Sequence, residues 1–173
     1  TGHIGDDARD GVIRRAKRID RVGRVIGRGE LRDEVVLTAI DAVRSDITEG
    51  KQGALLLLTL QIVEAKDCAP LQDTRVDVWH ADALGLYSGY ARLETGSAKG
   101  QTFLRGTQFT GTEGEVHFNT IYPGWYPGRT PHIHFKVFID NRNVITGQLY
   151  FPEHITEHVY AASPLPPPWS VEG

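Results

Sequence analysis

Residues 132–151 read HIHFKVFIDNRNVITGQLYF, a pattern of two β-strands joined by a tight turn. The odd-numbered positions from 133 to 139 are apolar, whereas the even-numbered positions begin with two histidines, His132 and His134. Successive side chains of a strand point to opposite faces, so the histidines share one face and the apolar residues share the other. The Asp-Asn-Arg-Asn sequence at 140–143 is typical of a turn. We therefore expect strands at 132–139 and 144–151, separated by a turn at 140–143.

Other strand-like runs precede these two strands at similar spacing. Apolar residues alternate with other residues from Leu56 to Ile62, and residues 75–79 alternate between polar and apolar. Residues 102–110 and 116–121 have the same character, and the glycine-containing sequence at 110–114 separates them. Short strands at this spacing predict a mainly β protein with an antiparallel β-sandwich fold.

The N-terminal region differs from the rest of the chain. Residues 8–34 carry apolar side chains at three- and four-residue steps, which predicts an amphipathic helix with a strongly basic polar face. We expect residues 1–50 to form a helical segment and lead-in, residues 51–163 the β-sandwich, and residues 164–173 a proline-rich tail. Because the apolar stripe needs burial, we also predict a homodimer formed through residues 8–34.

Composition excludes several classes of protein. The 173 residues are 40% hydrophobic and 24% charged, with a net charge of −3, which indicates a globular domain and argues against a nucleic-acid-binding protein. No apolar run approaches the ~20 residues of a membrane-spanning helix, so we expect no membrane partner. Since Cys68 is the only cysteine, any metal must be bound by histidine, tyrosine or carboxylate.

The histidine pair directly follows an unusual loop. Residues 120–131 contain two tyrosines, including Tyr126, together with a tryptophan, three prolines and two glycines. A His-x-His pair by itself is also common in ordinary packing, but this density of tyrosines at a strand end favours a designed pocket. Arg129, three residues before His132, is a permanent cation suited to hold a negative charge near a metal.

A second tyrosine-containing loop follows the strand at 75–79. The strand ends near His80, and a glycine-containing loop with Tyr87 and Tyr90 comes next. His80 has a side chain able to bind a metal. A histidine that closes a buried strand is, however, more often a packing residue held by hydrogen bonds.

Together these stretches resemble the intradiol ring-cleavage dioxygenases, the family of protocatechuate 3,4-dioxygenase and catechol 1,2-dioxygenase. The resemblance extends from about Asp46 to Tyr160, and its landmarks agree in order and spacing. They are DVWHA at 77–81, GLYS at 85–88, RGTQ at 105–108, PGWY at 123–126, RTPHIH at 129–134 and GQLYF at 147–151.

The resemblance implies a non-haem Fe(III) enzyme that uses O2 to cleave a catechol between its two hydroxylated carbons, yielding a cis,cis-muconate-type diacid. By motif position, the ligands of one iron per chain are Tyr87, Tyr126, His132 and His134. Arg129 and Gln148 match the active-site arginine and glutamine of the family, and Tyr126 also matches the tyrosinate that accepts a substrate proton. Two phenolates suit the hard Fe(III) cation and favour ferric over ferrous iron.

Two alternatives remain open at the level of sequence. His132 and His134 also fit a cupin-like or zinc site, although the glutamate that cupins carry a few residues later is absent before the turn at 140–143. Trp125, Tyr122 and Tyr126 also fit a non-catalytic β-sandwich that binds carbohydrate, since fold does not determine function.

One departure from the family concerns the substrate pocket. Many relatives carry a Glu-Gly-Pro-Tyr-Tyr-like segment before a Val-Arg-Ser-Asp stretch, whereas residues 36–46 run through without it. That segment can line the substrate pocket, so the sequence does not identify the preferred catechol. Short single-domain relatives include secreted bacterial proteins, which leads us to expect an extracytoplasmic location.

Overall fold

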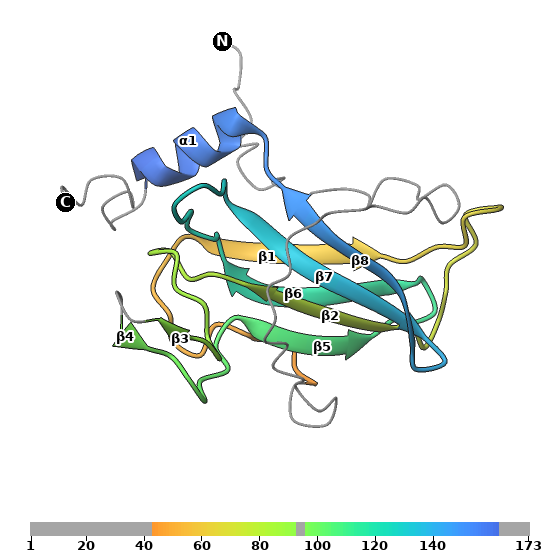
Figure 1. Ribbon diagram of the computed structural model, residues 1–173. Coiled ribbons are helices and arrows are strands. Elements are labelled where there is room, and N and C mark those ends of the chain that lie inside the picture. The colour runs from red at the N-terminus through yellow and green to blue at the C-terminus, as the bar shows by residue number, and fades with distance from the viewer. Residues whose placement is uncertain (1–42, 93–95, 163–173) are drawn as a thin grey trace, which may run out of the picture.

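A computed structural model of the chain describes residues 43–92 and 96–162. These residues form mainly antiparallel β-structure, with a helix near the C-terminal end (Figure 1). The elements are β1 (Leu55–Gln61), β2 (Arg75–His80), β3 (Ala91–Arg92), β4 (Gly96–Ser97), β5 (Arg105–Phe109), β6 (Glu115–Ile121), β7 (His132–Ile139), β8 (Arg142–Tyr150) and α1 (Glu153–Ala162).

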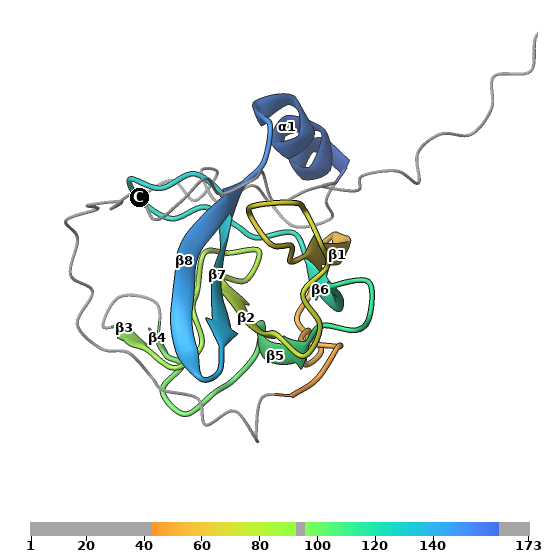
Figure 2. The same cartoon turned by 90° about the vertical axis from the view of Figure 1, so that its right-hand side faces the viewer.

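Two antiparallel sheets face each other across a common interior. The larger sheet has the strand order β5-β2-β7-β8, the smaller pairs β1 with β6, and the short strands β3 and β4 pair with each other. Figure 2 shows β8, β7, β2, β5, β6 and β1 following one another around the interior. The predicted mainly β, antiparallel fold is thereby confirmed for the described residues.

The segment before β1 joins the edges of the two sheets. Val43 forms a parallel bridge with Thr107 of β5, and Asp46 forms one with Asn119 of β6. The Ile47 N–H donates a hydrogen bond to the Asn119 carbonyl (3.0 Å), and the Ile47 side chain is fully buried. Part of the lead-in expected at 1–50 therefore packs into the sandwich core.

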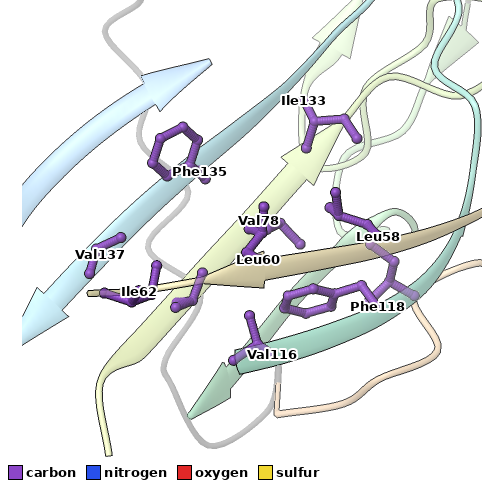
Figure 3. Close-up of a cluster of buried hydrophobic side chains, with 11 residues drawn as sticks. Leu58, Leu60, Ile62, Val78, Val116, Phe118, Ile133, Phe135 and Val137 are labelled. Carbon is purple, nitrogen blue, oxygen red and sulfur yellow. The ribbon is translucent and has the colours of Figure 1, made fainter. Parts of the chain in front are cut away.

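The core consists of the inward faces of strands from both sheets (Figure 3). Complete burial of one such Val, Leu, Ile or Phe side chain contributes roughly 1.5–3 kcal/mol. Because alternate residues of β7 point into this cluster, His132 and His134 lie on the opposite face, as the sequence predicts. The cluster comprises Ile47, Leu58, Leu60, Ile62, Val76, Val78, Val116, Phe118, Ile133, Phe135 and Val137.

The strands predicted at 132–139 and 144–151 pair as a β-hairpin, but β8 begins at Arg142, so the turn has two residues rather than the four predicted. Asp140 (φ 50°) and Asn141 (φ 61°) adopt the left-handed conformation that a type I′ turn requires at both central positions. Aspartate and asparagine tolerate this conformation better than other residues with side chains. The resulting register places Gln148 of β8 directly opposite His134.

Helix α1 is not predicted by the sequence pattern. It follows Pro152, whose carbonyl accepts a hydrogen bond from the Ile155 N–H (3.0 Å). It has only ten residues and none of them is fully buried. The Tyr160 hydroxyl donates a hydrogen bond to the Pro123 carbonyl (3.0 Å), which ties α1 to the loop after β6.

Two predictions fall outside the described residues: the helix at 8–34, with the homodimer it would form, and the tail at 164–173. The helical residues that the structure describes include no stretch with the length and hydropathy that a transmembrane helix requires.

Candidate metal centre

Tyr87 lies on the loop that follows β2, and Asp82 determines the course of that loop. The Asp82 carboxylate accepts hydrogen bonds from the backbone N–H groups of Leu84 (3.0 Å) and Leu86 (2.9 Å). Short-range bonds of this kind are how aspartate stabilises turns. Lys51 forms an ion pair with the same carboxylate (2.9 Å). The chain is therefore held just before it reaches Tyr87.

Glycines allow the Tyr87 loop to pack directly on the loop that carries Tyr126. The Asp82 carbonyl accepts hydrogen bonds from both Gly85 N–H and Gly124 N–H, each at 2.9 Å. A Cβ atom at Gly85 would lie 2.3 Å from a backbone oxygen of the other loop, and one at Gly124 would lie 2.4 Å from a backbone oxygen. The two loops thus meet backbone to backbone, which no residue with a side chain would permit.

On the other side of Tyr87, the buried Ser88 holds the chain. Arg105 of β5 donates hydrogen bonds to the Ser88 carbonyl (2.8 Å) and to the Ser88 hydroxyl (2.9 Å). The same hydroxyl donates to the Phe103 carbonyl (2.6 Å). Tyr87 is consequently positioned from both directions along the chain.

Tyr126 begins a tight turn that leads toward β7. The Arg129 N–H donates a hydrogen bond to the Tyr126 carbonyl (2.9 Å). Pro127 and Gly128 occupy the central positions, and Gly128 has a φ of 80°, the arrangement of a type II turn. Both central residues are exposed. The turn returns Arg129 to the vicinity of Tyr126.

His132 and His134 extend from the same face of β7. The Nδ1–H group of His132 donates a hydrogen bond to the Thr130 carbonyl (2.7 Å), which leaves the Nε2 lone pair free for another partner. The His134 ring lies parallel to the Trp79 ring, with centroids 4.9 Å apart and planes inclined by 6°. The two Nε2 atoms are 3.1 Å apart.

The fold brings the four predicted ligands together at one point. The Tyr87 hydroxyl lies 3.3 Å from Nε2 of His132 and 3.1 Å from Nε2 of His134. The Tyr126 hydroxyl lies 3.3 Å from Nε2 of His132. Ligand atoms bound tetrahedrally at about 2.0–2.1 Å from a transition metal are about 3.3 Å apart, so the observed spacing suits a single ion.

The tyrosines are essential to this set of donors. Within residues 43–92 and 96–162, no three His, Cys, Asp or Glu side chains form a group that could hold a metal ion. Two imidazole nitrogens and two phenol oxygens do form such a group, and phenolate oxygen suits a hard, highly charged cation.

Burial is the main cause of the pKa shifts of His132, His134 and Tyr87. Burial lowers the pKa of His132, and it lowers that of His134 to about 3, with further contributions from His132 and the Arg129 cation. Both imidazoles are therefore neutral at neutral pH. Burial also raises the pKa of Tyr87 well above its ordinary value, and the neighbouring Tyr126 raises it further. The Tyr87 phenol will ionise only beside a strong positive charge, which a metal ion provides.

Arg129 and Gln148, both predicted from sequence, lie together beside the four donors. Arg129 donates hydrogen bonds to the Gln148 side-chain oxygen and to the Tyr150 hydroxyl (3.2 Å). The Tyr150 hydroxyl donates to the same Gln148 oxygen. The sequence prediction missed Tyr150, although its position two residues after Gln148 on one strand puts it on the same face.

His80 does not join the cluster. Its Nδ1 atom lies 2.8 Å from the Ala81 carbonyl and its Nε2 atom lies 2.7 Å from the Thr120 hydroxyl, so both ring nitrogens are occupied. The side chain is 1% exposed, and this burial lowers its pKa to about 4. His80 is the hydrogen-bonded packing residue that its place at a strand end indicates.

The remaining tyrosines have packing roles. The Tyr90 ring meets Tyr87 edge-on, with centroids 6.1 Å apart. Tyr122 is 5% exposed, and its hydroxyl is hydrogen-bonded to that of Thr156 in α1 (2.7 Å). Because Tyr122 is buried, it cannot contribute to an exposed aromatic platform of the kind that a carbohydrate-binding surface needs.

Comparison with known proteins identifies relatives by sequence. A family model described as "Dioxygenase" matches residues 35–163. The protocatechuate 3,4-dioxygenase beta chain of Burkholderia cepacia is 30% identical over 122 residues, which cover 65% of this chain and 51% of that protein. A chlorocatechol 1,2-dioxygenase of Cupriavidus pinatubonensis is 30% identical over 114 residues, covering 55% and 42%. The chain spans about half the length of the curated relatives that it matches.

Comparison with solved structures also identifies dioxygenases. An intradiol ring-cleavage dioxygenase from Tetranychus urticae superposes with a TM-score of 0.65 at 36% identity, covering 71% of this chain and 64% of that one. The dioxygenase domain of a dioxygenase carbohydrate-binding protein fusion from Streptomyces sp. SirexAA-E superposes with a TM-score of 0.51 at 34% identity, covering 68% and 71%.

Proposed function

The chain belongs to the intradiol ring-cleavage dioxygenase family, and we propose that it is a non-haem Fe(III) enzyme that cleaves a catechol-type ring with O2. Cleavage would fall between the two hydroxylated carbons and give a cis,cis-muconate-type diacid. The observation that carries this proposal is the convergence of two phenol oxygens and two imidazole nitrogens, with separations of 3.1–3.3 Å.

In this proposal Tyr87, Tyr126, His132 and His134 hold one iron per chain. Bound Fe(III) would supply the positive charge that favours the phenolate forms of both tyrosines, and it would activate a bound catecholate toward O2. The lowered pKa values of the two histidines support their role as neutral ligands. The oxygen-rich donor set matches the preference of a hard cation.

Tyr126 is proposed to accept one substrate proton. A catechol that binds through both oxygens must lose two protons, and a phenolate is basic enough to take one of them. The exposed residues Pro127 and Gly128 directly follow Tyr126 in its turn, so its side chain is the better placed of the two tyrosines to move. The proton would reside on the Tyr126 phenol oxygen once that group leaves the ion.

Arg129 and Gln148 are proposed to stabilise the negative charge that develops on the ring. The hydrogen bonds to Gln148 and Tyr150 hold the Arg129 guanidinium in one orientation. Among the described residues, no carboxylate forms an ion pair with Arg129, so its charge is available to a bound substrate. A positively charged group already in place at the reacting centre needs no reorganisation during the reaction.

The colour, iron content and product of the full chain test this proposal. Protein loaded with Fe(III) should bind one iron per chain and show the visible charge-transfer band of an iron–tyrosinate complex. With catechol and O2 it should form a muconate that absorbs in the ultraviolet. A yellow semialdehyde from extradiol cleavage would refute the proposed reaction, and a colourless zinc protein would refute the proposed metal.

A further inference from the structure

The two histidines of the candidate metal centre are held in different ways. A metal-binding imidazole ordinarily donates its second N–H to a carboxylate, a backbone carbonyl or water, which determines the plane of the ring. His132 follows this rule, because its Nδ1–H donates to the Thr130 carbonyl at 2.7 Å. For His134, no oxygen atom of the described residues forms a hydrogen bond with Nδ1.

The polar group beside Nδ1 of His134 is the Gln148 amide. The Gln148 oxygen accepts hydrogen bonds from Arg129 and Tyr150, so the amide NH2 group faces Nδ1, at 3.4 Å. That separation exceeds the range of about 2.7–3.2 Å for N–H hydrogen bonds. When Nε2 binds a metal, the neutral ring carries its hydrogen on Nδ1, and two donor groups face each other. In this arrangement Gln148 offers His134 no acceptor comparable to the Thr130 carbonyl beside His132.

On its other flank, His134 lies flat against Trp79. The two residues are direct partners across β2 and β7, so their side chains share one face of the sheet. Their centroid distance of 4.9 Å and interplanar angle of 6° correspond to offset stacking. We propose that Trp79 is a positioning residue for the metal centre: its indole sets the plane of the His134 ring and aims Nε2 at the ion. This inference rests on the proposed iron site.

The indole is itself well supported. Trp79 lies on a central strand of the larger sheet, with Arg105 of β5 opposite it on one side and His134 of β7 on the other. The Lys136 ammonium lies 5.9 Å from the centre of the indole ring, at the outer limit of a cation–π contact. The next residue, His80, is buried and hydrogen-bonded through both nitrogens. The strand that carries the indole is thus held on both sides, which limits where the Trp79 ring can lie.

Different supports make the two histidines unequal ligands. A hydrogen bond from Nδ1–H to a carbonyl raises the basicity of the imidazole, and His132 has such a bond. Stacking constrains the ring of His134 without this electronic effect. Changing Trp79 should therefore alter the geometry of the site, which the spectrum of the bound ion reports, as well as its affinity.

The test compares iron release from the full chain in three variants. Trp79→Leu removes the flat ring, Trp79→Phe keeps one, and Phe138→Leu is a matched control on the same face of β7, where Phe138 contacts Arg75 rather than His134. Losing the support of a metal ligand typically costs ~10- to 100-fold in affinity, so Trp79→Leu should release iron to a chelator that much faster than wild type. Trp79→Phe and Phe138→Leu should stay near the wild-type rate.

Two spectroscopic measurements separate orientation from loss of stability. The electron paramagnetic resonance signal of Fe(III) should change in Trp79→Leu and remain unchanged in Phe138→Leu. In the metal-free protein, the ring protons of His134 should be shifted upfield by the indole in wild type but not in Trp79→Leu.

The outcomes distinguish this inference from the proposed function. If wild-type protein binds no iron, the proposed function fails. If wild type binds iron but Trp79→Leu releases it at the wild-type rate with an unchanged signal, the role of Trp79 alone is overturned. Absence of the upfield shift in metal-free wild type would overturn that role as well.

Discussion

The loops that carry Tyr87 and Tyr126 bring the same phenol group to the same point, yet the chain supports them differently. Tyr87 follows a turn closed by the Asp82 carboxylate and precedes Ser88, which is fully buried and bound by Arg105. Tyr126 is followed by two exposed residues before the chain returns to β7. On its N-terminal side, the Tyr126 loop rests on the Tyr87 loop through Gly124.

This difference shows that the backbone around a residue determines how freely its side chain can move, even when two side chains are identical. A ligand held on both sides keeps its position whatever binds nearby. A ligand whose following residues face solvent can re-aim at small cost. We therefore expect Tyr87 to remain a ligand throughout the reaction and Tyr126 to leave when substrate binds.

The largest expected effect is the difference between the Tyr87→Phe and Tyr126→Phe variants. Tyr87→Phe should lose most of its iron and its visible band, because it removes the more firmly held of the two proposed tyrosine ligands. Tyr126→Phe should keep part of its iron, since three ligands remain, but lose about 100- to 10,000-fold in turnover, as is typical when a general base is removed. Elemental analysis and stopped-flow mixing of anaerobic protein with catechol measure these effects. Catechol binding by Tyr126→Phe at the wild-type rate would contradict the comparison.

A second prediction concerns the contact between the two loops. Gly85 and Gly128 have nearly equal φ angles of 82° and 80°, so a side chain costs about 1–2 kcal/mol at either from the left-handed conformation. A Cβ at Gly85 would also lie 2.3 Å from the Trp125 carbonyl, whereas nothing lies within 4 Å of one at Gly128. Overpacking of this kind adds about 1–3 kcal/mol. Urea denaturation should therefore show a larger decrease in the free energy of unfolding for Gly85→Ala than for Gly128→Ala. Equal decreases would mean that the two loops do not pack against each other at Gly85.

A third prediction uses His80, which joins the bases of both loops through Ala81 and Thr120. Burial lowers the folded-state pKa of His80 to about 4, against about 6.5 in an unfolded chain. Between these values the unfolded chain binds a proton that the folded chain does not, so the free energy of unfolding should fall as pH decreases from 6.5 to 4. The loss should be on the order of 3 kcal/mol.

The control for the pH prediction is His80→Gln, which has no titrating ring. In urea denaturation of the metal-free proteins, the free energy of unfolding should decrease less between pH 7 and pH 4 in this variant than in wild type. An identical pH dependence in the two proteins would mean that His80 does not link the loops in the neutral form. Comparing the two proteins removes the contribution of His132 and His134, which both retain.

The smallest expected effect tests the support on the C-terminal side of Tyr87. Ser88→Ala removes the hydroxyl that contacts Arg105 and the Phe103 carbonyl, which should cost about 1–3 kcal/mol by leaving buried polar groups unsatisfied. Thr130→Ala changes an exposed side chain near the Tyr126 loop and should stay within about 0.5 kcal/mol of wild type. Thermal unfolding measures both, and similar values would remove the proposed difference in support.

Sequence reasoning predicts the strands because one face of each is apolar. Alternation in β1, β2 and β7 follows directly from packing one face of each strand into the core. The turn at Asp140 and Asn141 is predicted for an equally local reason, since these residues tolerate a positive φ. Such features depend only on neighbours in the chain.

The features that sequence reasoning missed depend on distant residues. Ile47 lies in a segment expected to precede the sandwich, yet it is buried because that segment pairs with β5 and β6. Helix α1 has ten residues, none of them fully buried, so it depends little on an apolar pattern in the sequence. Trp79 lies beside the site because it pairs with His134 across β2 and β7, and Tyr150 because it pairs with His132 across β7 and β8.

By itself, the sequence determined the chemical types of the candidate ligands and the shared face of His132 and His134, because residue identity and the two-residue repeat of a strand are local properties. The approach of two tyrosines from separate loops to within 3.3 Å of the histidine nitrogens depends on the folded arrangement of the chain. The support of Tyr87 on both sides and the stacking of His134 on Trp79 depend on the fold in the same way. These arrangements arise from strand pairing and loop contacts between residues far apart in the chain, and no local pattern contains them.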